Sequence, residues 1–237
     1  MVNLNYFGAM MVHMGDADGF VAGVSQNYPD TVRPALQIIK TQPNVHRVAA
    51  VFVIVTKKDI YFFADTHVNI DPSAEDLAEI AVLAAEVARE FDIEPRVAML
   101  SFSNFGSNHH AQSEKMRRAV ELTLEKNPEL IVEGEMMADT ALVPELMEEE
   151  YPFSQLKGGA TVLIFPDLAS ANIAYKMMLC IGGAESLGPI LTGLSKPVHV
   201  LQRGATVEEI VNMAAIAVVD AQKNSRQMQG VPRNFAA

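Results

Sequence analysis

The apolar positions of the chain follow two different periods. Short runs rich in β-branched residues alternate with segments of about ten or more residues in which apolar side chains recur at helical spacing. The short runs predict strands at 19–24, 48–55, 60–64, 96–102, 129–135, 160–165 and 197–201. The longer segments predict helices at 6–14, 32–40, 74–91, 113–126, 140–149, 169–181 and 206–222. This order is typical of βαβ crossovers and predicts a three-layer α/β/α fold with a mostly parallel sheet.

Polar residues between these segments indicate where several elements begin and end. The sequence TKKD at 56–59 joins two adjoining strands and suits a hairpin, which is the one antiparallel pair that the pattern indicates. Ser73 and Asp76 have the spacing of a capping box at the start of a helix. Pro34 suits the first turn of the helix that follows Thr31, so we expect Arg33 on that turn.

Size and composition narrow the class of protein. The chain has 237 residues, 49% of them hydrophobic, and a mean hydropathy of +0.14, which favours a folded protein of two lobes. A net charge of −11 argues against a nucleic-acid-binding surface. The single cysteine, Cys180, lies in an apolar run, so we expect a buried thiol and a cytoplasmic protein. No apolar run has the length of a membrane span, and no membrane partner is expected.

The two ends of the chain differ from the regular pattern between them. The helix expected at 6–14 has neither a cap nor a preceding strand, which suggests that the chain is part of something longer. Residues 223–237 are polar and predict a loose end.

Ligands of parallel sheets collect in the loops that follow the carboxyl ends of the strands. The loop SNFGS, from Ser103 and Asn104 to Ser107, could hold an anion at a helix start, although an ordinary polar connection is the commoner explanation of such a loop. His109 and His110 are expected to be solvated, because adjacent histidines diverge and no metal-ligand spacing surrounds them.

Four aspartates, Asp65, Asp71, Asp139 and Asp167, fall at strand-to-helix corners. At such a corner a carboxylate either caps a helix or acts as a general base, and capping is the commoner role. No metal site and no Ser-His-Asp arrangement is indicated, since GxSxG does not occur.

The segments DTVRPALQIIKT, VNIDPSAEDLAEIA, IEPRVAMLSFSNFGS, VLIFPDLASANIAYK and RGATVEEIVNMAAIAVVDAQ together resemble the phosphate acetyltransferase (phosphotransacetylase) family, from about Asp18 to Gln222. That family transfers an acetyl group between acetyl phosphate and coenzyme A, and the resemblance implies two α/β lobes with a ligand cleft. It covers only the C-terminal two thirds of the family. It implies a partial first lobe from 1–42 and 192–237, and a second lobe at 43–191.

The resemblance also implies which residues bind the ligand. Arg33 in TVRPA and Arg203 in QRG match two cleft arginines of the family, each near a helix start where a guanidinium group and free amides can hold an anion. Asn172 and Lys176 match positions near the coenzyme A channel. The full set implied for acetyl-CoA or phosphate is Thr31, Arg33, Ser103, Asn104, Asn172, Lys176, Gln202 and Arg203.

Two departures from the family pattern bear on catalysis. Gln202 stands where the family's Ser-Arg-Gly signature has a hydroxyl, and Phe105 stands where smaller or basic side chains are usual. A glutamine and a phenylalanine in an acyl-transfer cleft would remove a donor and fill space.

With these departures the chain is similar to the transacetylase-like C-terminal domain of bacterial NADP-dependent malic enzymes. That resemblance implies a regulatory acetyl-CoA-binding domain that lacks catalytic residues, forms a homo-oligomer through a dimer, and is attached to a malic domain that uses NADP and a divalent metal. An active phosphate acetyltransferase is the alternative, and a purely structural dimerisation module is a third possibility. If Thr206 is the N-cap of the helix after Arg203, then Thr206 and Glu209 form a capping box there.

Overall fold

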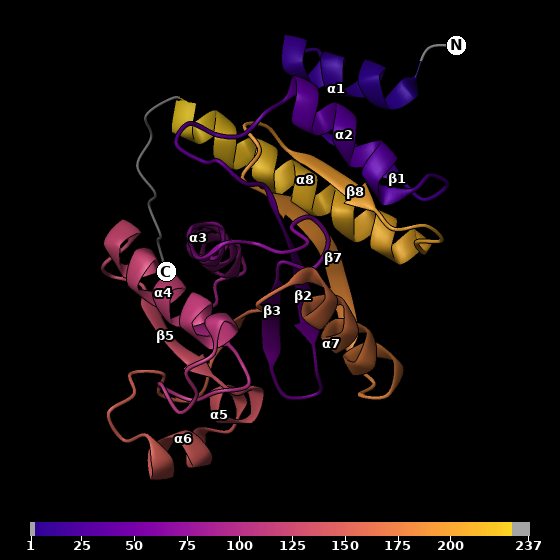
Figure 1. Ribbon diagram of the computed structural model, residues 1–237. Helices are drawn as coiled ribbons and strands as arrows, with labels where there is room; N and C mark the ends of the chain where they lie inside the picture. Colours follow the sequence, from indigo (N-terminus) through magenta and orange to yellow (C-terminus); the bar gives the residue numbers. More distant parts are fainter. Residues whose placement is uncertain (1–2, 229–237) are drawn as a thin grey trace. The chain divides into compact units, whose positions relative to one another are not determined.

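The structure is a computed structural model, and it describes residues 3–228 (Figure 1). The chain divides into two compact units, one built from residues 1–44 and 194–237 and the other from residues 45–193. We call them unit 1 and unit 2. The lobe boundaries expected from the sequence, at 42 and 192, lie two residues from these breaks. That unit 1 is only part of a lobe stays a prediction.

Unit 2 contains a sheet of six strands in its described residues, in the order β5-β4-β6-β3-β2-β7. The strands are β2 (Ala49–Val55), β3 (Ile60–Ala64), β4 (Arg96–Leu100), β5 (Ile131–Met136), β6 (Val162–Ile164) and β7 (Glu185–Thr192). The first four in that order pair in parallel, which confirms a mostly parallel sheet. The β2–β3 hairpin is confirmed by its antiparallel register, with Phe52 opposite Phe63.

Strand β7 is absent from the sequence-based prediction. It pairs antiparallel with β2, so the hairpin is not the one antiparallel pair of the sheet. Gly188 and Pro189 interrupt its apolar run, and both residue types normally argue against a strand interior. At Gly188, φ is +142° and a Cβ atom would lie 2.9 Å from the carbonyl oxygen of Val51. The glycine therefore allows the two strands to approach closely, at a place where the register of the pair shifts.

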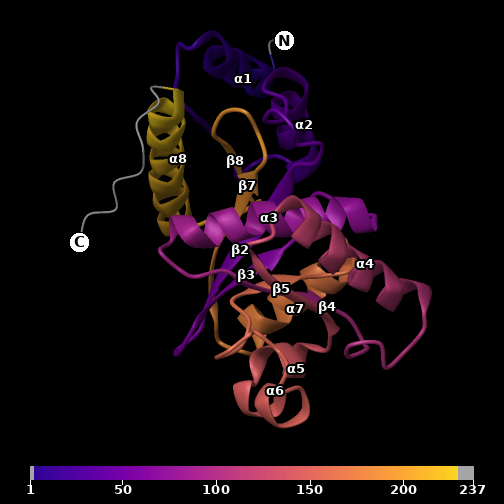
Figure 2. The same cartoon turned by 90° about the vertical axis from the view of Figure 1, so that its left-hand side faces the viewer.

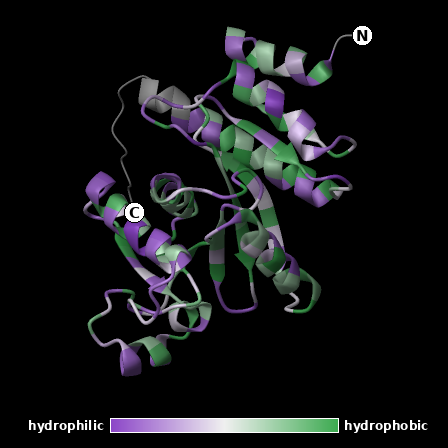
Figure 3. Cartoon of the chain, viewed as in Figure 1, coloured by the Kyte–Doolittle hydropathy of each residue, from purple (hydrophilic) through white to green (hydrophobic). Residues whose placement is uncertain are grey.

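Helices cover both faces of this sheet, as the three-layer prediction requires (Figures 1 and 2). The helices α3 (Ala74–Glu90) and α4 (Ala111–Lys126) lie on one face, and α7 (Leu168–Cys180), α5 (Ala138–Leu142) and α6 (Pro144–Glu150) lie on the other. The capping box of Ser73 and Asp76 at α3 is confirmed. Figure 3 shows the hydrophobic colour concentrated along the strands between these layers.

The single helix predicted at 140–149 is wrong, because the structure has the two short helices α5 and α6 in its place. Val143 separates them in an extended conformation, with φ −108° and ψ 98°. A residue that precedes a proline is driven out of the helical region, and Pro144 follows Val143 directly.

Unit 1 consists of α1 (Leu4–Met14), β1 (Phe20–Gly23), α2 (Tyr28–Ile38), β8 (Val198–Leu201) and α8 (Val207–Met228). Strands β1 and β8 form a parallel pair, with Val21 opposite His199. The first helix has an N-cap after all, since the Asn3 side chain accepts hydrogen bonds from the amides of Asn5 and Tyr6.

Two other helices of unit 1 differ from their predicted bounds. Helix α2 begins about one turn earlier than expected, with Pro29 in its first turn, so Pro34 lies inside the helix and Arg33 lies beyond the first turn. Helix α8 runs six residues beyond Gln222, so 223–228 are helical rather than loose. The remainder of the predicted loose end, 229–237, lies outside the described residues.

Candidate ligand-binding site

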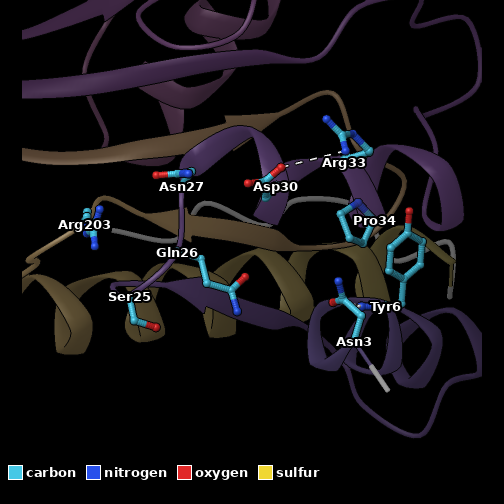
Figure 4. Close-up of a pocket in the computed structure, with 9 residues that line it drawn as sticks. All are labelled: Asn3, Tyr6, Ser25, Gln26, Asn27, Asp30, Arg33, Pro34 and Arg203. Carbon is cyan, nitrogen blue, oxygen red and sulfur yellow. Dashed lines mark hydrogen bonds and ion pairs between the residues drawn. The ribbon is translucent and has the colours of Figure 1, made fainter. Parts of the chain in front are cut away.

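A polar pocket of about 480 Å³ lies within unit 1 (Figure 4). Its walls come from the start of α1, the loop between β1 and α2, the first turns of α2, and the corner after β8. The lining residues are Asn3, Tyr6, Ser25, Gln26, Asn27, Asp30, Arg33, Pro34 and Arg203. The pocket thus brings together Arg33 and Arg203, which lie far apart in the sequence.

The corner that carries Arg203 is fixed to the β1–α2 loop. Gly23 ends β1 with φ +114°, and a Cβ atom there would lie 2.2 Å from the carbonyl oxygen of Leu201. The next residue, Val24, has φ +69° and is the centre of a tight turn in which the amide of Ser25 donates to Gly23. The Gly204 amide donates to the Val24 carbonyl over 3.1 Å. These contacts hold Arg203 beside residues 25–27 of the loop.

The start of α8 gives this corner a second support. Thr206 and Glu209 form the expected capping box, because the Thr206 amide donates to the Glu209 carboxylate and the Glu209 amide donates to the Thr206 hydroxyl. Further along, Nε2 of the buried His199 lies 2.8 Å from the Asp220 carboxylate and joins β8 to α8. The backbone on both sides of Arg203 is therefore well anchored.

Arg33 is held more loosely than the corner that carries Arg203. Its guanidinium lies 3.9 Å from the Asp30 carboxylate, and both side chains are about 60% exposed. Figure 4 shows Asp30 directed toward Arg33, with Arg203 at the opposite end of the pocket. Such an exposed ion pair contributes little stability and leaves Arg33 able to turn toward an anion.

The other polar groups of the pocket add hydrogen-bonding capacity. The Asn27 side chain makes no capping bond at the start of α2, although it stands at the N-cap. Asn5 donates to the Gln26 side chain over 2.5 Å, which leaves the Gln26 amide group as a donor. Two guanidinium groups and several side-chain amides suit a phosphate or carboxylate better than a neutral ligand.

Thr31 and Gln202 do not line this pocket among the described residues. Thr31 is fully buried, and its hydroxyl donates to the Asn27 carbonyl over 3.2 Å, so it supports the first turn of α2. Gln202 is half-buried beside Arg203.

The SNFGS loop of unit 2 is organised around a carboxylate of the chain itself. Glu135, buried at the end of β5, accepts hydrogen bonds from the Ser103 hydroxyl at 2.8 Å and the Gly106 amide at 2.9 Å. Arg117 on α4 donates to both of its oxygens, at 3.0 and 3.2 Å. Burial alone would raise the pKa of Glu135, but these hydrogen bonds outweigh it and hold the pKa below its usual value.

This arrangement uses the donors that a bound anion would need. The Asn108 amide donates to Ser103, and the Asn104 side-chain oxygen accepts from the Met137 amide. Ser103 is fully buried. The loop therefore contains an internal carboxylate at the place where the sequence suggested a phosphate or carboxylate ligand. No feature of the sequence GEM indicated that Glu135 would be buried.

Phe105 has a local packing role. Its ring lies 4.9 Å from the Tyr151 ring and 5.0 Å from the Phe153 ring, centre to centre. The phenylalanine thus belongs to an aromatic cluster of unit 2, which weakens the expectation that it fills space needed by a ligand.

Asn172 and Lys176 lie on α7, one turn apart and on the same face. Nζ of Lys176 lies 5.0 Å from the centre of the Tyr175 ring. Cys180 ends the same helix and is exposed, so the prediction of a buried thiol is wrong. Its apolar neighbours Met177 and Ile181 are themselves exposed, at 53% and 79%.

The four corner aspartates have different roles. Asp167 caps α7 by accepting from the Ser170 amide, which confirms capping at this corner, and Asp71 pairs with Lys115 at 3.1 Å. Asp139 lies in the first turn of α5. Asp65 is buried and orders the loop after β3, because its carboxylate accepts hydrogen bonds from the amides of His67 and Asn69.

The two adjacent histidines are exposed, as expected, and His110 also caps α4 by accepting from the Gln112 amide. Within the described residues, no group of three or more His, Cys, Asp or Glu side chains is placed to hold a metal ion. In that same part of the chain, no helix combines the length and apolarity that crossing a membrane requires.

A mostly parallel α/β chain with two arginines and several amides around one polar pocket has the features of an anion-binding protein. More particularly, the chain belongs to the phosphate acetyl/butaryl transferase family, whose model matches residues 1–218.

Named relatives agree with this family. The phosphate acetyltransferase of Bacillus subtilis (strain 168) is 47% identical over 221 residues, which cover 93% of this chain and 68% of that protein. The phosphate acetyltransferase of Nitratidesulfovibrio vulgaris is 46% identical, over 92% of this chain and 31% of that protein. A phosphotransacetylase structure from Streptococcus pyogenes superposes with a TM-score of 0.87 at 46% identity, over 94% of this chain and 68% of that chain.

These findings confirm the transferase family and the fold that the sequence motifs predicted. They give no support to the malic-enzyme part of the prediction, which remains a hypothesis. Of the two functions considered, a regulatory acetyl-CoA-binding domain and an active phosphate acetyltransferase, the comparisons favour the second.

Proposed function

We propose that this chain is an active phosphate acetyltransferase, which exchanges an acetyl group between acetyl phosphate and coenzyme A. The observation that carries the proposal is the pocket in which Arg33 and Arg203 lie with several amides, in a chain 47% identical to a phosphate acetyltransferase. The alternative considered from the sequence is thereby preferred to the regulatory function.

The reaction places specific demands on such a pocket. The thiol sulfur of coenzyme A bonds to the acetyl carbon while the bond from that carbon to the phosphate oxygen breaks. The electron pair leaves with inorganic phosphate, and the thiol proton passes to the solvent or to a phosphate oxygen. Negative charge grows on the leaving phosphate, so arginines that stay charged at all working pH values stabilise it.

Arg203 is the better placed of the two arginines to stabilise a transition state, because its backbone is fixed on both sides by Gly204 and the Thr206 cap. A preorganised donor contributes more than one that must first be ordered. Arg33 is held only by an exposed ion pair with Asp30, so it is less preorganised than Arg203.

Acetyl-CoA is the ligand that the proposal requires. For unit 2, Asn172 and Lys176 stay proposed contacts of coenzyme A, whereas Ser103 and Asn104 are taken up by Glu135 and the Met137 amide and are no longer proposed as contacts. For unit 1, Thr31 and Gln202 are proposed to support the arginines. We also propose that the protein forms a homo-oligomer, with a dimer formed through this chain, and that it is cytoplasmic.

A second function is motivated by Gln202. This longer amide stands beside Arg203 where a hydroxyl is expected, so the chain could bind acetyl-CoA as a regulatory signal without transferring it. In that hypothesis the chain is the acetyl-CoA-binding domain of a malic enzyme, whose separate domain uses NADP and a divalent metal.

One assay separates the two functions. The full chain is mixed with acetyl phosphate and coenzyme A, and the thioester is followed by its absorbance. Formation of acetyl-CoA well above the rate without protein supports the transferase. A background rate together with measurable acetyl-CoA binding by calorimetry would instead favour the regulatory function.

A further inference from the structure

Asn5 is a polar residue among the buried side chains of α1, beside Ala9 and Val12. Only 6% of its surface is exposed. A buried amide needs a hydrogen-bond partner, because leaving its polar atoms unpaired costs free energy. Its Nδ2 group donates to the side-chain oxygen of Gln26 over 2.5 Å. Asn5 therefore joins α1 to the loop between β1 and α2.

The two partners of this hydrogen bond differ in how firmly they are held. Asn5 lies in the first turn of α1, directly after the N-cap Asn3. Further along that helix, Nζ of Lys196 donates to the Val12 carbonyl over 2.9 Å and ties α1 to the segment before β8. Gln26, by contrast, is an exposed loop residue. The hydrogen bond thus orders a loop side chain against an anchored helix.

Gln26 lines the same pocket as Arg33 and Arg203, and Figure 4 shows its side chain extending from the loop toward the Asn3 end of that pocket. A glutamine side chain has one oxygen that accepts hydrogen bonds and one NH₂ group that donates two. Since the oxygen already accepts from Asn5, the NH₂ group is the part that can serve a ligand. A donor beside two guanidinium groups suits an anion, whereas the oxygen in that place would repel one.

We propose that Asn5 is a positioning residue of the anion pocket: by holding the oxygen of Gln26, it fixes the Gln26 NH₂ group as a further donor to the phosphate group bound with Arg33 and Arg203. Asn5 is not among the lining residues of the pocket in the described part of the chain, so it acts through Gln26. The inference rests on the proposed function, which makes the anion a phosphate. It adds two residues that the sequence motifs did not indicate.

The advantage of this arrangement is preorganisation. An exposed glutamine without a partner has several rotamers and two orientations of its amide, and binding would have to select one of them. The hydrogen bond from Asn5 makes that selection during folding. The phosphate of acetyl phosphate and the phosphate that leaves can both accept from the same NH₂ group, so we expect Gln26 to stabilise the ground state and the transition state about equally.

Asn5→Asp reverses the orientation of the Gln26 amide. An ionised aspartate accepts but does not donate, so it should bind the Gln26 NH₂ group and turn the oxygen toward the pocket. A carboxylate in the first turn of a helix also agrees with the helix dipole, which favours folding of N5D. The measurements are made at about pH 8, where the new carboxylate is ionised.

Calorimetric titration of the full chain with inorganic phosphate compares the wild type, N5D, Gln26→Ala and the double variant. Gln26 is exposed, so Q26A should fold even if N5D does not. The double variant separates orientation from charge, because N5D in the Q26A background retains only the effect of the added charge. Asn212→Asp makes the same change on an exposed position of α8 in the same unit and is the matched control.

Q26A should weaken phosphate binding roughly tenfold, since a hydrogen bond to a charged group is lost. N5D should weaken it at least as much as Q26A. In the Q26A background, N5D should add less than about threefold, because the remaining charge effect is screened by salt. N212D should bind as the wild type does. Equal affinity of the wild type and Q26A, or the same factor for N5D in both backgrounds, overturns the proposal.

Steady-state kinetics gives a readout that loss of structure alone would not move. N5D should raise KM for acetyl phosphate about tenfold, with kcat and the KM for coenzyme A within about twofold, because uniform binding is lost. A lower kcat with unchanged KM would mean that Asn5 only supports folding, and it would overturn the proposal. Coupling of Asn5 and Gln26 in phosphate binding without acetyl transfer would keep this pair and reject the transferase. Transfer without that coupling would do the reverse.

Discussion

Arg203 lies at the corner between β8 and α8, where its backbone is fixed and its side chain is exposed. We expect Arg203→Ala to weaken binding of acetyl-CoA or phosphate by about 1.5–3 kcal/mol, because a charge-assisted hydrogen bond is lost. Calorimetry of the variant measures this. Arg118→Ala, which removes an exposed arginine of α4, is the control. Equal losses in both variants, or none in R203A, would place the anion elsewhere.

His67 makes the stability of the protein depend on pH. Its pKa is about 4 in the folded protein and 6.5 without the fold, so the unfolded chain takes up the proton first as the pH falls. Stability is therefore lost as the pH drops from 6.5 toward 4. Between pH 7 and pH 5, the wild type should lose about 2 kcal/mol of unfolding free energy through this residue.

Urea unfolding of the wild type and His67→Gln at the two pH values isolates that contribution. The carboxylates with shifted pKa values, Asp76 and Glu135 among them, are common to both proteins and cancel in the comparison. If H67Q loses as much stability as the wild type, the histidine is not destabilised by its surroundings.

At this scale the sequence identified residues by resemblance more than by pattern. Arg33 and Arg203 were recognised from TVRPA and QRG, and the pocket brings them together. Periodicity could not have shown that the two arginines line one pocket, because this depends on the close approach of β1 and β8 at Gly23. Glu135 was missed, since a glutamate in a strand reads as solvent-facing unless the arginine that pairs with it is known.

The parallel pair of β1 and β8 supports the pocket at the scale of elements. Gly23→Ala should destabilise unit 1 by more than about 2 kcal/mol, because φ is +114° and the new Cβ would lie 2.2 Å from the Leu201 carbonyl oxygen. Gly15→Ala is a matched control, since φ is +88° there but no atom lies within 4 Å. It should cost only about 1 kcal/mol of backbone strain.

Thermal unfolding and calorimetry of the two glycine variants check this difference. G23A should also bind phosphate less well. Moving β1 away from β8 would disturb the hydrogen bond from the Gly204 amide to the Val24 carbonyl, which holds Arg203 in place. Equal stability of G23A and G15A would mean that the strands separate without cost.

Prolines explain most of the errors in the predicted elements. The sequence pattern predicts Pro34 as the first-turn proline of α2, although Pro29 occupies that place. Pro144 separates α5 from α6, and Pro189 concealed β7. In each case more than one local structure tolerates the proline, and tertiary contacts decide between them. The long periodic segments of α3 and α4, which contain no proline, are predicted to within one or two residues.

The chain consists of two units that differ in the size of their sheets. Unit 2 has a six-stranded sheet with helices on both faces, whereas the described residues of unit 1 have two paired strands and three helices. The matched region is 68% of the Bacillus subtilis relative. The overall α/β class followed from the alternation of periods, but the division into units requires contacts between residues 1–44 and 194–237 that no local pattern encodes.

The central claim is that the pocket of Arg33 and Arg203 serves acetyl transfer. It is tested most directly by the initial rate of acetyl-CoA formation from acetyl phosphate and coenzyme A, compared between the wild type, Arg203→Gln and the exposed control Arg118→Gln. We predict a measurable rate in the wild type and R118Q, and a rate lower by a factor of about 100 or more in R203Q. A wild-type rate at background, or equal rates in wild type and R203Q, would contradict the claim.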